Sequence, residues 1–294
     1  MRDFIATKAD VVLQNMRSGL VRKYGIDDTL RERNPRLVYC NMGAFGAKGP
    51  LSDRPGYDPM MQAFGGIRSI TGEEGRPPVR VGCSIIDMST GMWAVIGVLA
   101  ALQRRSATGE GSVVDTSLYE SALCWVGSAS SNYLASGEVP GRRGTEMSFL
   151  VPYKIFEASD GYMLIAAGND SLFGRLCVAL GHPEWREDSR FTGNPARVAH
   201  RDIVNNMVQE IVGANTRAHW IAIFERERVP CAGLQGIDEV LAHPQTLALD
   251  MLQKTPDGRK AFMGTPLSFD GQRPPMERAP PDLGADTAMV AGKR

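Results

Sequence analysis

Short β-rich apolar runs alternate with helix-forming segments along the first half of the chain, and this alternation is the strongest constraint on its fold. The runs occupy residues 9–14, 37–42 and 113–118, a strong helix is predicted over residues 87–105, and another helix is predicted over residues 120–134. Strands separated by helices in this way pair in parallel through right-handed crossovers. The sequence therefore predicts an α/β fold with a parallel sheet.

The first predicted element is unusual for such a sheet. Residues 3–8 form a helix that leads into the first strand, so this helix has no strand before it. Either one edge of the sheet begins in an unusual way, or the sequence begins inside a domain whose first strand and helix lie upstream. Both interpretations stay open on the residues alone.

The pattern changes after about residue 144. Residues 152–156 and 162–166 alternate as strands around Ser159-Asp160-Gly161, which is a hairpin signature. Predicted helices follow at 172–180, 201–212 and 217–226. This second pattern is typical of a small α+β domain.

The C-terminal part contains a proline-rich segment. Residues 271–281 hold four prolines, which favour an extended strap over a packed element. We therefore expect a large sheet domain over residues 1–143, a second, smaller α+β domain over 144–262, and a strap over 263–294 that returns to the large domain.

Charge and cysteine content exclude several functional classes. The chain has 294 residues with 33 basic and 33 acidic side chains, so no net charge attracts nucleic acid or an anionic membrane. The five cysteines have no Cys-x-x-Cys or Cys/His spacing, which predicts no metal site and favours buried free thiols. No signal peptide begins the chain, and the longest apolar run, residues 91–102, is shorter than the roughly 20 residues of a membrane span. We expect a cytoplasmic protein.

Asp87 is the most informative candidate for chemistry, because glycine-rich phosphate loops and a Gly-x-Ser-x-Gly motif are missing from the sequence. Asp87 lies at the N-terminal edge of the predicted helix over residues 87–105, where a carboxylate can serve as a cap. It can also serve as a nucleophile, since the helix dipole and free N–H groups would hold it ionised. A thioester substrate would supply the good leaving group that a carboxylate nucleophile needs.

Tyr57 lies in a polar loop, residues 52–58, after the predicted strand over residues 37–42. Ligands of open parallel sheets bind outside the carboxyl ends of the strands, so this loop is placed to line a site. An ordinary surface turn is the alternative interpretation.

A series of ordered motifs runs along nearly the whole chain. They include Asn34-Pro-Arg-Leu-Val-Tyr-Cys40, Phe45-Gly-Ala-Lys-Gly-Pro50, Asp53-Arg-Pro-Gly-Tyr-Asp58, Gln62-Ala-Phe-Gly-Gly66, Asp87-Met-Ser-Thr-Gly-Met92 and Val114-Asp-Thr-Ser-Leu118. In this order they resemble the family III CoA-transferases of the CaiB/BaiF type.

The resemblance implies a Rossmann-like large domain, a smaller domain, and two chains that interlock as a homodimer. It implies transfer of CoA from an acyl-CoA to a free carboxylic acid, with no permanently bound cofactor. Asp87 matches the catalytic aspartate, which would attack the thioester and form first a mixed anhydride and then an aspartyl-CoA thioester.

The resemblance also implies a set of CoA contacts, with cations for the nucleotide phosphates. They carry over onto Asn15, Met16, Arg17, Lys23, Arg54 and Tyr57. This sequence departs from the family pattern at Met16 and Ser18, which replace a commoner Phe and Pro, and at Lys23, where formyl-CoA transferases have an arginine.

Two alternatives accompany this hypothesis. Related α-methylacyl-CoA racemases share the fold and use a histidine at the position of Tyr57, where a phenol is a poor base at neutral pH. The second alternative is a truncated, inactive remnant that folds or dimerises only. It arises because members of the family begin with a strand, helix and loop that this sequence lacks, which agrees with the helix over residues 3–8 that no strand precedes.

Overall fold

The computed structural model describes residues 2–290, which fold into two compact units. The first unit extends to Gly144 and includes the residues from Thr287, whereas the second comprises Thr145–Asp286. The first unit has one sheet and two clusters of buried apolar side chains, and the second unit has two sheets and one such cluster. The return of residues 263–294 to the large domain stays a prediction.

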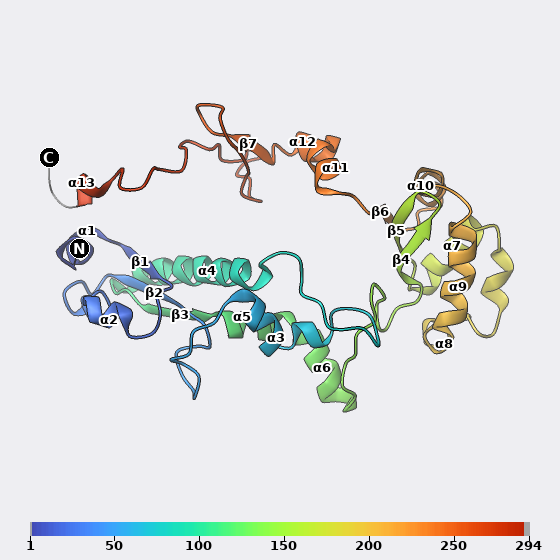
Figure 1. The fold of residues 1–294 in the computed structure, drawn as a ribbon, viewed down its shortest axis with the longest axis horizontal. Coiled ribbons are helices and arrows are strands. Elements are labelled where there is room, and N and C mark those ends of the chain that lie inside the picture. Colours follow the sequence, from blue (N-terminus) through green and yellow to red (C-terminus); the bar gives the residue numbers. More distant parts are fainter. Residues whose placement is uncertain (1, 291–294) are drawn as a thin grey trace. The chain divides into compact units, whose positions relative to one another are not determined.

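The first unit is built on a parallel sheet of three strands (Figure 1). These strands are β1 (Val11–Gln14), β2 (Val38–Gly43) and β3 (Val113–Ser117), in the order β1-β2-β3. Both pairs of strands are parallel, as the alternation of strands and helices predicts. Their register places Gln14 beside Asn41 and Asn41 beside Asp115.

Helix α4 (Ile85–Thr108) packs along β2 and β3 and ends at Gly109, whose φ of 80° is left-handed. Small residues let the helix approach the sheet, since a Cβ atom on Gly97 would lie 2.6 Å from Cγ1 of Val114. The helix is longer than the predicted apolar run. By length and composition this helix could cross a membrane. Of its most apolar stretch of 18 residues, 28% is buried in the structure.

The first unit also contains several short helices. They are α1 (Arg2–Lys8), α2 (Leu20–Tyr24), the 3-10 helix η1 (Asp28–Glu32), α3 (Asp58–Phe64), the 3-10 helix η2 (Ile67–Ser69), α5 (Leu118–Trp125), α6 (Gly127–Ser136) and α13 (Thr287–Val290). Ile5 of α1, Leu30 of η1 and Tyr39 of β2 share one buried cluster. The elements α1 and η1 therefore cover part of β2.

The end of β3 differs from the sequence prediction. The strand stops at Ser117, whose Oγ atom accepts a hydrogen bond from the backbone N–H of Glu120 at 3.2 Å and so caps α5. A single helix was expected over residues 120–134, but the structure has two, because Val126 with φ −90° and ψ 11° separates α5 from α6.

The second unit has an antiparallel sheet covered by helices. Its strands are β4 (Tyr153–Ala158), β5 (Gly161–Ala166) and β6 (Cys231–Gly233), and its helices are α7 (Asp170–Ala179), the 3-10 helix η3 (Pro183–Glu187), α8 (Asn194–Ala199), α9 (Arg201–Val212) and α10 (Arg217–Arg226). The hairpin between β4 and β5 lies where Ser159-Asp160-Gly161 predicts it.

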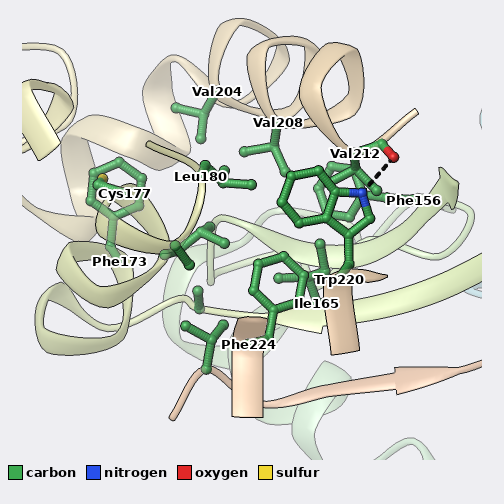
Figure 2. Packing of buried hydrophobic residues seen from close by; sticks show 14 of the residues in the cluster. Phe156, Ile165, Phe173, Cys177, Leu180, Val204, Val208, Val212, Trp220 and Phe224 are labelled. Atoms are coloured by element: carbon green, nitrogen blue, oxygen red, sulfur yellow. Dashed lines mark hydrogen bonds between the residues drawn. The ribbon is translucent and has the colours of Figure 1, made fainter. Parts of the chain in front are cut away.

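Aromatic side chains form the centre of this second core (Figure 2). Trp220 stacks on Phe224 with ring centroids 5.6 Å apart, and its indole N–H donates to the carbonyl of Val212 at 2.8 Å. Burial raises the pKa of the Cys177 thiol in this core to about 11. The expectation of buried thiols is wrong for Cys83 and Cys124, which are free and exposed.

The remainder of the second unit consists of α11 (Ile237–Ala242), α12 (Pro244–Ala248), β7 (Leu252–Lys254) and β8 (Ala261–Met263). The strands β7 and β8 form an antiparallel pair. Between residues 237 and 286 no apolar side chain is buried, and exposed ones include Ile237, Leu247, Leu267 and Phe269. This segment therefore has no apolar core of its own.

Candidate active site

The direction of α4 places Asp87 at the carboxyl ends of the strands. Near the other end of the helix, the Arg105 guanidinium donates to the carbonyl of Arg36 at 3.0 Å and pairs with Asp10 at 3.0 Å. Arg36 and Asp10 precede β2 and β1, so the C-terminal end of α4 lies at the start of the strands. Its N-terminal end, with Asp87, therefore lies at the edge where open parallel sheets bind ligands.

Three polar side chains, one from each strand, form a row of hydrogen bonds across β1, β2 and β3. The Gln14 amide donates to Oδ1 of Asn41 at 2.7 Å, and the Asn41 amide donates to Oδ1 of Asp115 at 2.8 Å. Oε1 of Gln14 also accepts from the backbone N–H of Met16 at 2.8 Å. The row therefore holds the start of the loop after β1, which contains the predicted CoA contacts Asn15, Met16 and Arg17.

One side-chain hydrogen bond joins the loop after β1 to the loop before α3, which comprises residues 44–57. The Ser18 hydroxyl donates to Oδ1 of Asp53 at 2.6 Å. Arg54 directly follows Asp53, so this bond brings the segments that carry Arg17 and Arg54 together. Lys23 lies in α2, which begins after Gly19.

The predicted cations are available to a ligand. The side chains of Arg17, Lys23 and Arg54 are exposed, and none of them forms an ion pair with another residue of the described chain. Tyr57 is 64% exposed and has extended backbone at the N-cap of α3. Within the described residues no ion pair of these cations would compete with binding of an anionic ligand.

The N-terminus of α4 is capped by Asp58, which is only 2% exposed. Its Oδ2 atom accepts hydrogen bonds from the backbone N–H groups of Ile86 at 2.8 Å and Asp87 at 3.2 Å. Its Oδ1 atom accepts from the Gln62 amide at 2.7 Å, and Oε1 of Gln62 accepts from the N–H of Val81 at 2.9 Å. Asp58 and Gln62 thus tie the start of α4 to α3.

This arrangement corrects two interpretations of Asp87. Asp87 is the third residue of a helix that begins at Ile85, so it is not the cap. The first N–H groups of α4 are also not free to stabilise its carboxylate, because Asp58 accepts two of them and Ser84 accepts the N–H of Met88 at 3.0 Å. No residue of the described chain donates a hydrogen bond to the carboxylate of Asp87.

The environment raises the pKa of the Asp87 carboxyl group. Partial burial is the larger cause, and the negative charge of Asp58 adds to it. The sequence had indicated the opposite direction, because a helix dipole alone lowers such a pKa. A carboxylate that is poorly stabilised by its surroundings is more basic and therefore more nucleophilic.

Buried hydroxyl groups hold α4 against α5 below Asp87. The Thr90 hydroxyl donates to Oγ of Ser121 at 2.8 Å, and the Trp125 indole N–H donates to Oγ of Ser89 at 3.0 Å. These bonds fix the first turns of α4 against α5, and the contact between the two helices therefore sets the position of Asp87.

Sequence reasoning missed Asp58 and Gln62. Asp58 ends the motif Asp53-Arg-Pro-Gly-Tyr-Asp58, but the sequence assigned no role to it. A carboxylate directly before Pro59, at the start of a helix, is a signal of a structured position, yet the sequence does not show which backbone groups it meets.

Comparisons with known proteins identify the family. The model of CoA-transferase family III matches residues 3–287. The chain is 35% identical to an acetyl-CoA:oxalate CoA-transferase from Acetobacter aceti over 92% of its length and 70% of that protein's. This chain belongs to CoA-transferase family III. It also superimposes with a TM-score of 0.85 on the crystal structure of a CaiB/BaiF family protein from Brucella suis, to which it is 35% identical. The superposition covers 99% of this chain and 77% of that one.

The family III chain is shorter than its curated relatives. It is 34% identical to an acyl-CoA transferase from Fusarium pseudograminearum over 96% of its own length but spans only 63% of that protein. In the described part of this family III chain, no group of three His, Cys, Asp or Glu side chains has an arrangement that could hold a metal ion.

Proposed function

We propose that this chain transfers CoA from an acyl-CoA to a free carboxylic acid, with Asp87 as the nucleophile. The observation that carries the proposal is the division of roles between two carboxylates. Asp58 is buried and caps α4, whereas Asp87 is exposed and has no hydrogen-bond donor in the described chain. Capping therefore does not occupy Asp87, and its carboxylate is left for chemistry.

The proposed reaction has four balanced steps. The Asp87 carboxylate attacks the thioester carbonyl, which breaks the C–S bond and gives a mixed anhydride and the CoA thiolate. The thiolate attacks the aspartyl carbonyl, so the donor acid leaves as its carboxylate and an aspartyl-CoA thioester forms. The acceptor carboxylate then attacks this thioester and forms a second anhydride with release of the thiolate. Attack of the thiolate on the acceptor's acyl carbon gives the new acyl-CoA and restores Asp87.

Asp87 and the predicted cations lie within reach of one long substrate with an anionic end. Arg17 and Arg54 lie beside the Ser18–Asp53 contact, and Asp58, five residues after Asp53, contacts the backbone of Asp87. Five residues span at most about 18 Å. An extended acyl-CoA can bridge a distance within this limit, because its phosphates and its thioester lie at opposite ends of the molecule. No further cofactor enters any of the four steps.

The names of the relatives support the substrate class. The Acetobacter aceti protein is an acetyl-CoA:oxalate CoA-transferase, which pairs an acyl-CoA with a carboxylic acid. We propose the same pair of substrate classes here, without a choice of donor or acceptor.

We also propose that two copies of the chain form an interlocked homodimer. The face of α4 away from the sheet exposes Met88, Met92, Trp93, Val95, Ile96 and Leu99. The segment over residues 237–286 adds further exposed apolar side chains. An exposed apolar helix face of this kind marks an association surface, and a second copy would cover it. Sedimentation equilibrium tests the dimer, and a cytoplasmic location stays a proposal from the sequence.

The decisive experiment measures acyl exchange by mass spectrometry. The full chain is incubated with succinyl-, acetyl- or formyl-CoA and a panel of carboxylic acids that includes oxalate, beside Asp87→Ala and Asp53→Asn variants. New acyl-CoA species with the unsubstituted chain and with Asp53→Asn, but not with Asp87→Ala, support the proposal. Exchange that persists in Asp87→Ala overturns the role of Asp87. Failure to bind CoA at all favours the inactive remnant, and α-proton exchange of a 2-methylacyl-CoA in D2O without CoA transfer favours the racemase.

A further inference from the structure

Ser18 and Asp53 form the one side-chain hydrogen bond in the described chain that joins the loop after β1 to the loop before α3. The Oγ and Oδ1 atoms are 2.6 Å apart, and the two residues are separated by 35 positions in the sequence. Hydrogen bonds from a hydroxyl to a carboxylate are short and stronger than neutral ones. The contact is therefore specific, although both side chains are exposed.

The loop after β1 is held on both sides of Ser18. The N–H of Met16 donates to Oε1 of Gln14 at 2.8 Å, and the N–H of Leu20 donates to the carbonyl of Arg17 at 3.1 Å. Gly19, with a left-handed φ of 75°, then turns the chain into α2. The backbone at Ser18 thus has a defined position, from which its hydroxyl reaches Asp53.

The loop before α3 is anchored at both of its ends, where Ala44 and Phe45 pack against a buried cluster and Asp58 contacts α4. Between these ends, Asp53 and Arg54 lie in an exposed turn closed by the bond from the N–H of Arg54 to the carbonyl of Leu51 at 2.9 Å. Across this turn, Ser18 is the contact that fixes Arg54 relative to Arg17.

From this geometry we propose that the Ser18–Asp53 hydrogen bond is a positioning contact that joins the two loops into one binding site for the phosphates of CoA. The proposal rests on the proposed function, because it assigns CoA to these loops. The contact holds Arg17 and Arg54 at a fixed spacing before the ligand binds, which lowers the entropy lost on binding. Its loss weakens CoA binding and leaves the chemical steps at Asp87 unchanged.

Asp53 also makes the proposal sharply testable, because its charge and its acceptor oxygen have opposite effects. The carboxylate repels an anionic ligand, while its Oδ1 atom accepts from Ser18. Asp53→Asn keeps an acceptor oxygen and removes the charge, whereas Asp53→Ala removes both. We therefore expect Asp53→Asn to bind CoA at least as tightly as the unsubstituted chain and Asp53→Ala to bind it more weakly.

The experiment is a double-mutant cycle on CoA binding, measured by calorimetry on the full chain. Ser18→Ala and Asp53→Ala should each weaken binding by about three- to tenfold, and the double variant should be no weaker than either single variant. Ser18→Thr keeps a hydroxyl and should restore binding. At saturating acyl-CoA, kcat of Ser18→Ala should stay within about twofold of the unsubstituted value while KM rises. Circular dichroism confirms that each variant is folded.

Three results would overturn the proposal. They are unchanged CoA affinity in Ser18→Ala, independent losses that multiply in the double variant, and equal losses in Ser18→Thr and Ser18→Ala. Any of these with an active unsubstituted chain removes this proposal alone. Absence of CoA binding by the unsubstituted chain removes the proposed function and this proposal together, so the two failures are distinguishable.

Discussion

The Oδ2 atom of Asp58 lies 3.2 Å from the backbone nitrogen of Asp87 and 2.8 Å from that of Ile86. One buried carboxylate thus fixes the backbone that carries a second, exposed carboxylate. The same negative charge helps to raise the pKa of Asp87. Asp58 therefore affects Asp87 in two ways, through position and through charge, and substitutions can separate them.

We predict that Asp58→Asn lowers the free energy of unfolding of the first unit by about 1–3 kcal/mol, because one of its two acceptor oxygens is lost and buried N–H groups are left unsatisfied. Urea unfolding measures this change. In the same variant the pKa of Asp87 should fall, since a neighbouring negative charge is removed, and the acid limb of the activity profile should move to lower pH.

Asp28→Asn is the matched control for this variant, because Asp28 is an exposed aspartate of the same unit whose side chain forms no ion pair within the described residues. Its effect on stability should stay within about 0.5 kcal/mol. Equal stability of the two variants, or an acid limb that does not move in Asp58→Asn, would contradict the role of Asp58.

The raised pKa of Asp87 predicts a pH-dependent gain of stability in Asp87→Asn. The folded state holds the proton of Asp87 more tightly than the unfolded state does, so this group favours folding when protonated and opposes it when ionised. Asp87→Asn should therefore be more stable than the unsubstituted chain at neutral pH. The difference should shrink as pH falls through the folded pKa.

Urea titrations from about pH 8 to about pH 4 test this prediction across the range in which carboxyl groups ionise. A constant difference at every pH would show that Asp87 has an ordinary pKa. A less stable Asp87→Asn at neutral pH would show that the ionised form stabilises the fold, as the sequence alone had indicated.

Strands β1 to β5 were predictable because their signals are local, whereas the three-residue strands β6, β7 and β8 were not predicted. The apolar run that forms β2 and the Ser159-Asp160-Gly161 turn are complete within a few residues of sequence. The break of the helix at Val126 was not predictable in this way. Gly127 directly follows Val126, but a single glycine within a helical pattern does not by itself end a helix, so the pattern over residues 120–134 predicts one helix where the structure has two.

The candidate site was predictable only in part, because it depends on contacts between distant residues. Asp87 could be singled out by its motif and its place near a helix start. Its surroundings could not, since Asp58 is 29 residues away in the sequence and Ser18 is 35 residues from Asp53. The cap was misassigned because the helix begins two residues before Asp87, within the usual error of a predicted boundary.

Two glycines of α4 offer a matched test of how closely the helix packs on the sheet. A Cβ atom at Gly97 would lie 2.6 Å from Val114, whereas one at Gly91 would meet nothing within 4 Å. We predict that Gly97→Ala destabilises the chain by about 1–3 kcal/mol through overpacking. Gly91→Ala should stabilise it by up to about 1 kcal/mol, because alanine is the better helix former.

Thermal unfolding of both variants checks this pair. A stabilised Gly97→Ala would show that the helix can move away from β3 without cost. A destabilised Gly91→Ala would show that this exposed side of the helix is covered, as a second copy of the chain would cover it.

Arg54 should contribute to binding of the substrate's phosphates and not to the chemistry at Asp87. The guanidinium is exposed and has no acidic partner in the part of the chain that the structure describes. We predict that Arg54→Gln raises KM for acyl-CoA by about three- to tenfold, since a charge-assisted hydrogen bond is lost, and changes kcat by less than about twofold. The affinity of the unsubstituted chain for CoA should also fall more steeply with added salt than that of Arg54→Gln, because ions screen the attraction that this variant has lost.

Arg80→Gln is the control, since Arg80 is an exposed arginine outside both loops. A fall in kcat with unchanged KM in Arg54→Gln would place Arg54 near the reacting carbonyl instead of the phosphates.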